Sequence, residues 1–180
     1  MHFFDHLRTV NRHRRLVRKY CFRLGLYWQG LTHDLSKYSP TEFFRSVKYY
    51  QGYRSPNDQE RMVNGVSLSW LHHKGRNRHH FEYWIDYCLK PEGGVHMGGC
   101  KMPKKYVAEM FCDRVAACRI YQGKQYTDAS AYDYYQHSIG HIIINAETHA
   151  LLNRWLLLLK EEGEDAALRY IRRELAGNTY

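Results

Sequence analysis

The stretch HDLSKYSPTE, residues 33–42, joins a histidine–aspartate pair to a helix start, and the fold assignment begins there. Ser39 suits the N-cap position, Pro40 suits the first helical position, and Glu42 completes a capping box. We therefore expect a helix from Pro40 to about Gln51.

The segments on either side of this stretch have the hydrophobic spacing of helices. A helix is expected from residue 1 to about 26, and a short segment up to Asp34 is expected to continue helically. The remaining expected helices lie at residues 56–75, 79–89, 104–121 and 128–138, and at about 145–175, where Gly163 breaks the pattern into two. No stretch alternates convincingly between polar and apolar residues, so the predicted fold class is all-α.

One segment lacks helical spacing. Residues 90–103 hold four of the 13 glycines and two of the four prolines, so they are expected to form an irregular loop, placed to act as a lid over a site. A chain of 180 residues is long enough for one substantial core. We expect a single domain over residues 1–180, with the C-terminal helices of about 145–175 packing on it.

The composition excludes several classes of protein. Hydrophobic residues make up 44% of the chain and there are only 4 prolines, which excludes a disordered chain. The longest apolar stretch, 151–159, is interrupted and too short for a membrane span, so no membrane partner is expected. The N-terminus lacks the features of a signal peptide, and the 5 cysteines form no C-x-x-C motif. A cytoplasmic protein with reduced cysteines is expected.

Two ionisable side chains lie on helix faces that are otherwise apolar. His13 lies between Val10 and Val17, and Asp113 lies between Met110 and Ala117. A single histidine in this setting is more often a hydrogen-bonded core residue than a ligand. A buried carboxylate, however, is costly unless it is paired with a cation or a metal. Two such residues on separate helices are expected to meet.

His33 and Asp34 add an imidazole and a carboxylate to this pair, and Lys37 follows three residues later. Nitrogen and oxygen donors together suit a divalent transition metal (Mn, Fe, Co, Ni or Zn), whereas calcium prefers oxygens alone. One or two ions are expected. Such a site would activate a water molecule at neutral pH, and Lys37 could neutralise a phosphate oxygen or a leaving group.

A third block, HHKGRNRHH at residues 72–80, has two interpretations. It is either an exposed basic helix end or part of the site. In the second case, one histidine of each pair (His72 or His73, and His79 or His80) binds a second metal, and a cation of the block meets an anionic substrate. The candidate substrate-binding cations of this block are Lys74, Arg76 and Arg78. Four further histidines, His96, His137, His141 and His149, are assigned to surface or loop positions.

The order His13, His33-Asp34, Asp113 resembles the H...HD...D signature of the HD-domain superfamily, which are all-helical, metal-dependent phosphohydrolases. The run from His33 to Lys37 is similar to the HD-x-x-K form of its nucleotide hydrolases, and MFCDRVAA (110–117) resembles the helix that supplies the last aspartate. HDLSKYSPTEF and HHKGRNRHHFEYW together resemble small HD-like families of bacterial and phage proteins. The resemblance implies an HD-like helical bundle. It also implies that His13, His33, Asp34 and Asp113 share a first metal, with Asp34 bridging to a second.

Three functions are compatible with these features. The first is a metal-dependent phosphohydrolase acting on a nucleotide or other small phosphate ester, with Asp34 and Lys37 as catalytic residues. The second is a di-iron oxygenase of the same superfamily. The third is a non-catalytic basic module with a structural or vestigial metal site, which would bind nucleic acid or a partner protein. Its basic face from Arg8 to Arg23 would attract nucleic acid, since the net charge is +9. The apolar run WLLLL (155–159) is either buried or the seam of a homo-oligomer.

Overall fold

The computed structural model describes residues 2–90 and 92–177, and within them helices dominate. The α-helices are α1 (Phe3–Arg23), α2 (Tyr27–Thr32), α3 (Pro40–Tyr49), α4 (Pro56–Asn64), α5 (Leu68–Lys74), α6 (Lys104–Gln122), α7 (Ser130–Ser138) and α8 (Ala146–Ala176). Short 3-10 turns lie at Leu35–Tyr38, Phe81–Trp84, Gly123–Gln125 and Ile139–His141. Two strands, β1 (Ile85–Leu89) and β2 (Val95–Gly99), complete the fold. The all-α prediction is therefore confirmed at the level of class, with one small hairpin added.

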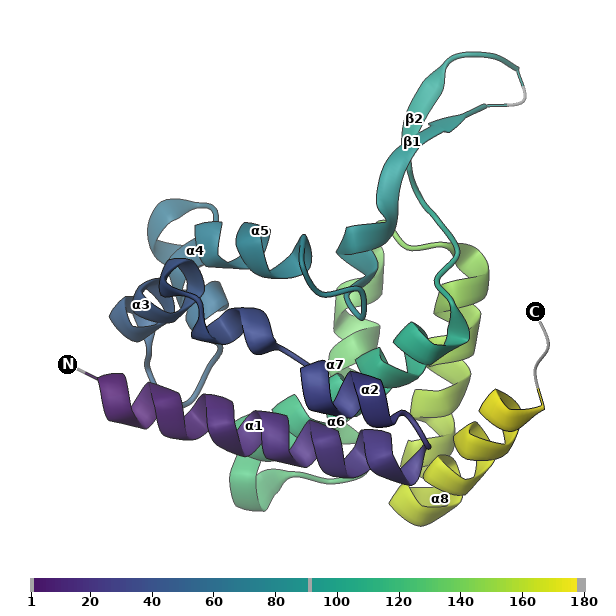
Figure 1. Ribbon diagram of the computed structural model, residues 1–180. Coiled ribbons are helices and arrows are strands. Elements are labelled where there is room, and N and C mark those ends of the chain that lie inside the picture. Colours follow the sequence, from purple (N-terminus) through teal and green to yellow (C-terminus); the bar gives the residue numbers. More distant parts are fainter. Residues whose placement is uncertain (1, 91, 178–180) are drawn as a thin grey trace.

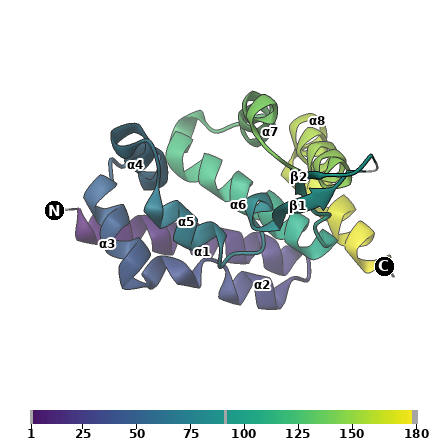
Figure 2. The same ribbon diagram turned by 90° about the horizontal axis from the view of Figure 1, so that it is seen from above.

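Helix α6 is the centre of the core. It packs against α1 on one side and against α8 on the other, and Figures 1 and 2 show it between them. Its buried side chains point in nearly all directions, because every residue from Val107 to Cys112 is buried. Trp155 of α8 is fully buried in the same core, together with Leu156 and Leu159. The run WLLLL therefore packs inside the chain, which is the first of its two predicted roles.

The helix boundaries follow local sequence signals. Ser39 accepts a hydrogen bond from the Glu42 amide, and Pro40 opens α3 as expected. Gly163 breaks α8 at the expected place, with a φ of 82°. The predicted helix over 56–75 is instead two helices, because Gly65 ends α4 in the left-handed region and Ser67 caps α5. None of the described helices combines the length and the apolar character that crossing a membrane requires.

The expectation of a helix at 79–89 followed by an irregular loop was wrong. Phe81–Trp84 is a single 3-10 turn, and residues 85–89 pair antiparallel with residues 95–99, so that Tyr87 faces Met97. Gly93 and Gly94 both have positive φ and allow the chain to reverse. The hairpin projects away from the helices in Figure 1, so the described residues of this segment do not lie over the site as a lid.

Candidate metal centre

Asp34 stands at the centre of the site, in a turn between α2 and the 3-10 turn Leu35–Tyr38. It is the one non-glycine residue with positive φ (54°) among the described residues, and its side chain is fully buried. Arg14 of α1 holds the turn by donating to the carbonyl oxygens of His33 (2.7 Å) and Leu31 (3.1 Å). A strained backbone that keeps a carboxylate buried is typical of a functional site.

A first group of possible metal ligands surrounds one Asp34 oxygen. His33 Nε2 lies 3.3 Å and His13 Nε2 lies 3.6 Å from Asp34 Oδ2. Asp113 of α6 closes the group, because its Oδ1 is 2.9 Å from His13 Nε2. The four ligand atoms lie within 4.8 Å of one another. The first predicted ligand set, from three separate elements, is therefore brought together.

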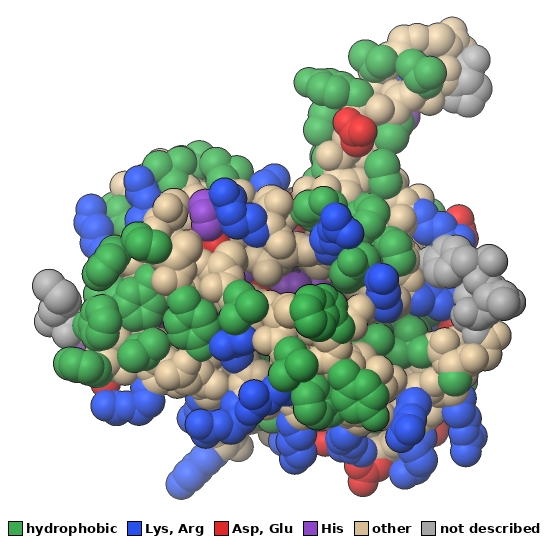
Figure 3. Space-filling model, viewed as in Figure 1, with side chains coloured by type: hydrophobic (Ala, Val, Ile, Leu, Met, Phe, Trp, Pro, Cys, Tyr) green, Lys and Arg blue, Asp and Glu red, His purple; other side chains and the backbone are tan. Residues whose placement is uncertain are grey.

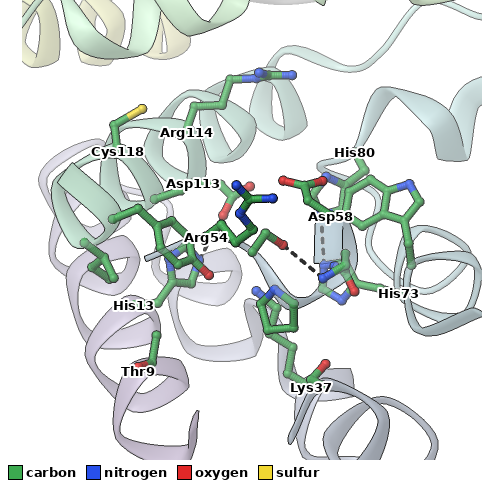
Figure 4. A pocket seen from close by; sticks show the side chains of 18 of the residues that line it. Thr9, His13, Lys37, Arg54, Asp58, His73, His80, Asp113, Arg114 and Cys118 are labelled. Atoms are coloured by element: carbon green, nitrogen blue, oxygen red, sulfur yellow. Dashed lines mark hydrogen bonds and ion pairs between the residues drawn. The ribbon is translucent and has the colours of Figure 1, made fainter. Parts of the chain in front are cut away.

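A second group surrounds the other Asp34 oxygen. His73 Nε2 lies 3.3 Å and His79 Nε2 lies 3.4 Å from Asp34 Oδ1. His80 Nε2 is 2.9 Å from His73 Nε2, which places a third imidazole in this group. Figure 4 shows His73 and His80 on the opposite side of the cavity from His13 and Asp113. Asp34 is thus shared by two groups of imidazoles.

Two buried glutamates orient the histidines from behind. Glu109 Oε1 accepts from Nδ1 of His33 (2.9 Å) and of His79 (3.1 Å), so one carboxylate serves both groups. Glu42 accepts from His73 Nδ1 (2.9 Å) and from His72 Nδ1 (2.7 Å). A carboxylate on Nδ1 fixes the ring and leaves Nε2 free to bind a metal. Both glutamates therefore complete the pattern expected of metal-binding histidines.

The electrostatics keep Asp34 and His80 in metal-binding forms. Burial alone would raise the pKa of Asp34, but His33 and Lys37 hold it well below its ordinary value. Burial and the neighbouring His79 and His73 lower the pKa of His80 well below its ordinary value, so its ring is neutral. An ionised carboxylate and a neutral imidazole are the forms that coordinate metals. Burial would lower the pKa of His33 and His73, but Asp34 raises the pKa of both rings, so a metal would have to displace a proton from them.

The donor atoms fit a transition metal. Among the described residues, Asp34 Oδ1 and His79 Nε2 are buried and have no hydrogen-bond partner, while Asp34 Oδ2 is held by its ion pair with Lys37. Buried polar atoms without partners are costly, and a metal would satisfy them. The mixture of imidazole and carboxylate favours Mn, Fe, Co, Ni or Zn over calcium. Both groups could therefore hold a metal ion.

Several predicted residues lie elsewhere. His72 contacts Glu42 and is not part of either group. Arg76 donates to the His72 carbonyl and Arg78 to the Tyr106 hydroxyl, and neither they nor Lys74 are among the described residues that line the adjacent cavity. The structure therefore does not bring these three cations to the cavity, and their contact with a substrate stays a prediction.

Sequence analysis missed Glu109 and the second role of Glu42. Glu109 lies one helical turn before Asp113, and this spacing on a mostly apolar face was a usable signal. Glu42 was assigned to a capping box, but its side chain points to the histidines of α5. His6, which is buried on α1, also lines the cavity, and burial lowers its pKa to about 4.

A cavity of about 480 Å³ opens beside the two groups. Lys37, His73 and Asp113 line its floor, and Figure 4 shows Arg54 extending into it. Lys37 Nζ is 2.6 Å from Asp34 Oδ2. Burial would lower the pKa of Lys37, but Asp34 raises it above its ordinary value, so the side chain is an ammonium ion. The cavity therefore offers a fixed positive charge next to the metal-ligand atoms.

The fold and the site define a mostly helical protein with a buried histidine–aspartate centre that could hold metal ions. The chain belongs to DUF5662, a family of unknown function whose model matches residues 2–157. No curated protein and no solved structure matches it. The matched range contains every residue of the two ligand groups and ends within α8.

Proposed function

We propose that this protein is a metal-dependent phosphohydrolase with a two-metal centre bridged by Asp34. The observation that supports the proposal most directly is the position of that carboxylate, each oxygen of which faces two imidazoles 3.3–3.6 Å away. Metal ions in such a centre make a coordinated water acidic enough to react near neutral pH and polarise a phosphoryl oxygen. The resemblance to HD-type hydrolases supports the same reaction class.

The residues of the site would have two roles, metal binding and neutralisation of charge on the substrate. His13, His33 and Asp113 would hold the first metal, and His73, His79 and His80 would hold the second, with Asp34 common to both. Lys37 Nζ, on the cavity wall, would neutralise charge on a phosphoryl oxygen. Its ion pair with Asp34 fixes the ammonium group next to the reacting position, so little reorganisation would be needed.

The test starts with metal content. Protein purified without an affinity tag, and reconstituted anaerobically with Mn, Fe, Co, Ni or Zn, would be analysed by mass spectrometry and assayed for phosphate release from a panel of nucleotides and phosphate esters. We expect about two equivalents of metal and turnover of at least one ester. Bound metal without turnover of any ester would contradict the hydrolase. Absence of metal, with salt-sensitive binding to nucleic acid, would favour the basic module instead.

The number of imidazoles favours a second candidate, a di-iron oxygenase. Five histidine Nε2 atoms belong to the two groups, against two aspartates. Nitrogen-rich sites also suit iron. Iron retained as a pair after aerobic purification, together with oxygen uptake, would establish this alternative. Full phosphatase activity with Mn or Zn would exclude it as the main function.

A further inference from the structure

Two arginines on the cavity wall lack carboxylate partners. Arg54, in the loop between α3 and α4, donates to Met62 Sδ and lies over the Tyr53 ring. Arg114, the residue after Asp113 on α6, lies 5.0 Å from the centre of the Tyr135 ring. Within residues 2–90 and 92–177, no ion pair joins either guanidinium to an acid. Both therefore keep positive charge available to a ligand.

The other lysine and arginine among the described lining residues, Lys37 and Arg61, each have a carboxylate partner. Lys37 pairs with Asp34 at 2.6 Å, and Arg61 pairs with Asp58 at 2.7 Å. Arg114 differs further because its Nε is buried and has no hydrogen-bond acceptor among the described residues. A buried donor without an acceptor is unfavourable, and an anionic ligand would supply the acceptor.

The size and lining of the cavity point to a ligand larger than phosphate. Its volume of about 480 Å³ falls in the range of small-molecule sites. Trp70, Tyr121 and Tyr134 are among its lining residues and would pack against an organic group. In Figure 4, Arg54 reaches into the middle of the cavity, whereas Arg114 projects from the helix that carries Asp113.

We propose that Arg54 and Arg114 form a second anion subsite, and that the substrate is an organic phosphate ester with a second phosphate group. One phosphate would lie at the metal-ligand groups beside Lys37. The second would be held by the two unpaired guanidinium groups, which suit the oxygens of a phosphate. That the group at the metal ligands is a phosphate rests on the proposed function. The second subsite, by contrast, is tested by binding alone.

The probes are methylenediphosphonate, which carries two phosphonate groups and has no hydrolysable P–O–P bond, and methylphosphonate, which carries one. Calorimetry on the metal-loaded protein is expected to give at least tenfold tighter binding of the diphosphonate. Arg54→Ala and Arg114→Ala should each reduce this preference at least threefold. Arg114→Lys should restore part of it, which a merely structural effect on packing would not. Arg76→Ala, an exposed arginine off the cavity, is the matched control and should keep the full preference.

The outcomes separate this inference from the hydrolase. An equal preference in Arg54→Ala, Arg114→Ala and Arg76→Ala would overturn the subsite, because the diphosphonate would then be held by the metal ions alone. That result would leave the hydrolase intact. A preference that depends on Arg54 and Arg114 in a protein without phosphatase activity would support the subsite and contradict the hydrolase.

Discussion

The two ligand groups that meet at Asp34 are built in different ways. The first combines His13 of α1 with Asp113 of α6, two long helices that pack against each other in the core. The second takes three imidazoles from eight consecutive residues, His73 to His80, at the end of α5. The first group is therefore fixed by global packing. The second depends on one short segment and on what holds it.

Local hydrogen bonds hold that segment. Asn77 Nδ2 donates to the His73 carbonyl (2.8 Å) and to Ser36 Oγ (2.9 Å), which ties the turn after α5 to the Asp34 region. Glu42 orients His73 from α3, and Glu109 orients His79 from α6. Asp34 and Glu109 therefore couple the two groups, whereas Glu42 acts on the second group alone.

The largest effect is expected at the shared carboxylate. Asp34→Ala removes the oxygen that faces each group, so both metals should be lost, with no detectable turnover. Metal content by mass spectrometry should fall from about two equivalents to near zero, with circular dichroism showing nearly unchanged helix content. Asp86→Ala, on the exposed hairpin, is the matched control. Two metals retained in Asp34→Ala would show that the groups are independent.

The next largest effect is a loss of metal affinity on substitution of Glu109 or Glu42, and it should differ between these two glutamates. Glu109→Gln weakens the acceptor behind both His33 and His79, so affinity for both metals should fall about 10- to 100-fold. Glu42→Gln should weaken the second metal by a similar factor and leave the first unchanged. Stepwise metal titration measures both. If the two variants lose the same metals to the same extent, the proposed division between the groups is wrong.

Two members of the first group, His13 and Asp113, could be predicted from helical periodicity, whereas His33 and Asp34 were named from their adjacency and from the HD-like resemblance. His13 and Asp113 interrupt apolar faces, and such faces meet in a helical core. The residues of the second group were named, but one histidine of each pair was expected, whereas the structure brings His73 together with both His79 and His80. The directions of His72 and His73 depend on the register of α5, whose start was set by Ser67 after the unexpected break at Gly65.

Features that depend on long-range packing were not predictable. The hairpin forms because residues 85–89 pair with residues 95–99, whereas residues 79–89 were expected to form a helix. The contribution of Arg54 to the cavity lining was not predicted, since it depends on how α3 and α4 place the loop between them. Lys74, Arg76 and Arg78 were assigned to substrate by proximity to histidines in sequence, which says nothing about direction on a turn.

A smaller effect, on kcat rather than on metal content, is expected for Lys37, which pairs with Asp34 on the cavity side. Lys37→Ala leaves both ligand groups in place, so metal content should be retained while kcat falls at least tenfold. The reason is the loss of the ammonium group that lies next to Asp34 Oδ2. Lys74→Ala, which removes a lysine outside the cavity lining, is the control. An unchanged kcat in Lys37→Ala would remove this residue from the chemistry.

The smallest effect on metal binding is expected for a substitution of His72, which lies next to the ligand His73 on α5. His73 Nε2 faces Asp34, whereas His72 reaches only Glu42, through Nδ1, and is outside both groups. His73→Ala should therefore abolish binding of the second metal. His72→Ala removes one of two imidazoles that Glu42 holds, so affinity for the second metal should change no more than about threefold, well below the effect of losing an orienting carboxylate. Titration of the two variants side by side tests the register of α5 directly. If His72→Ala loses as much metal as His73→Ala, both rings bind the second metal, and the second ligand group also includes His72.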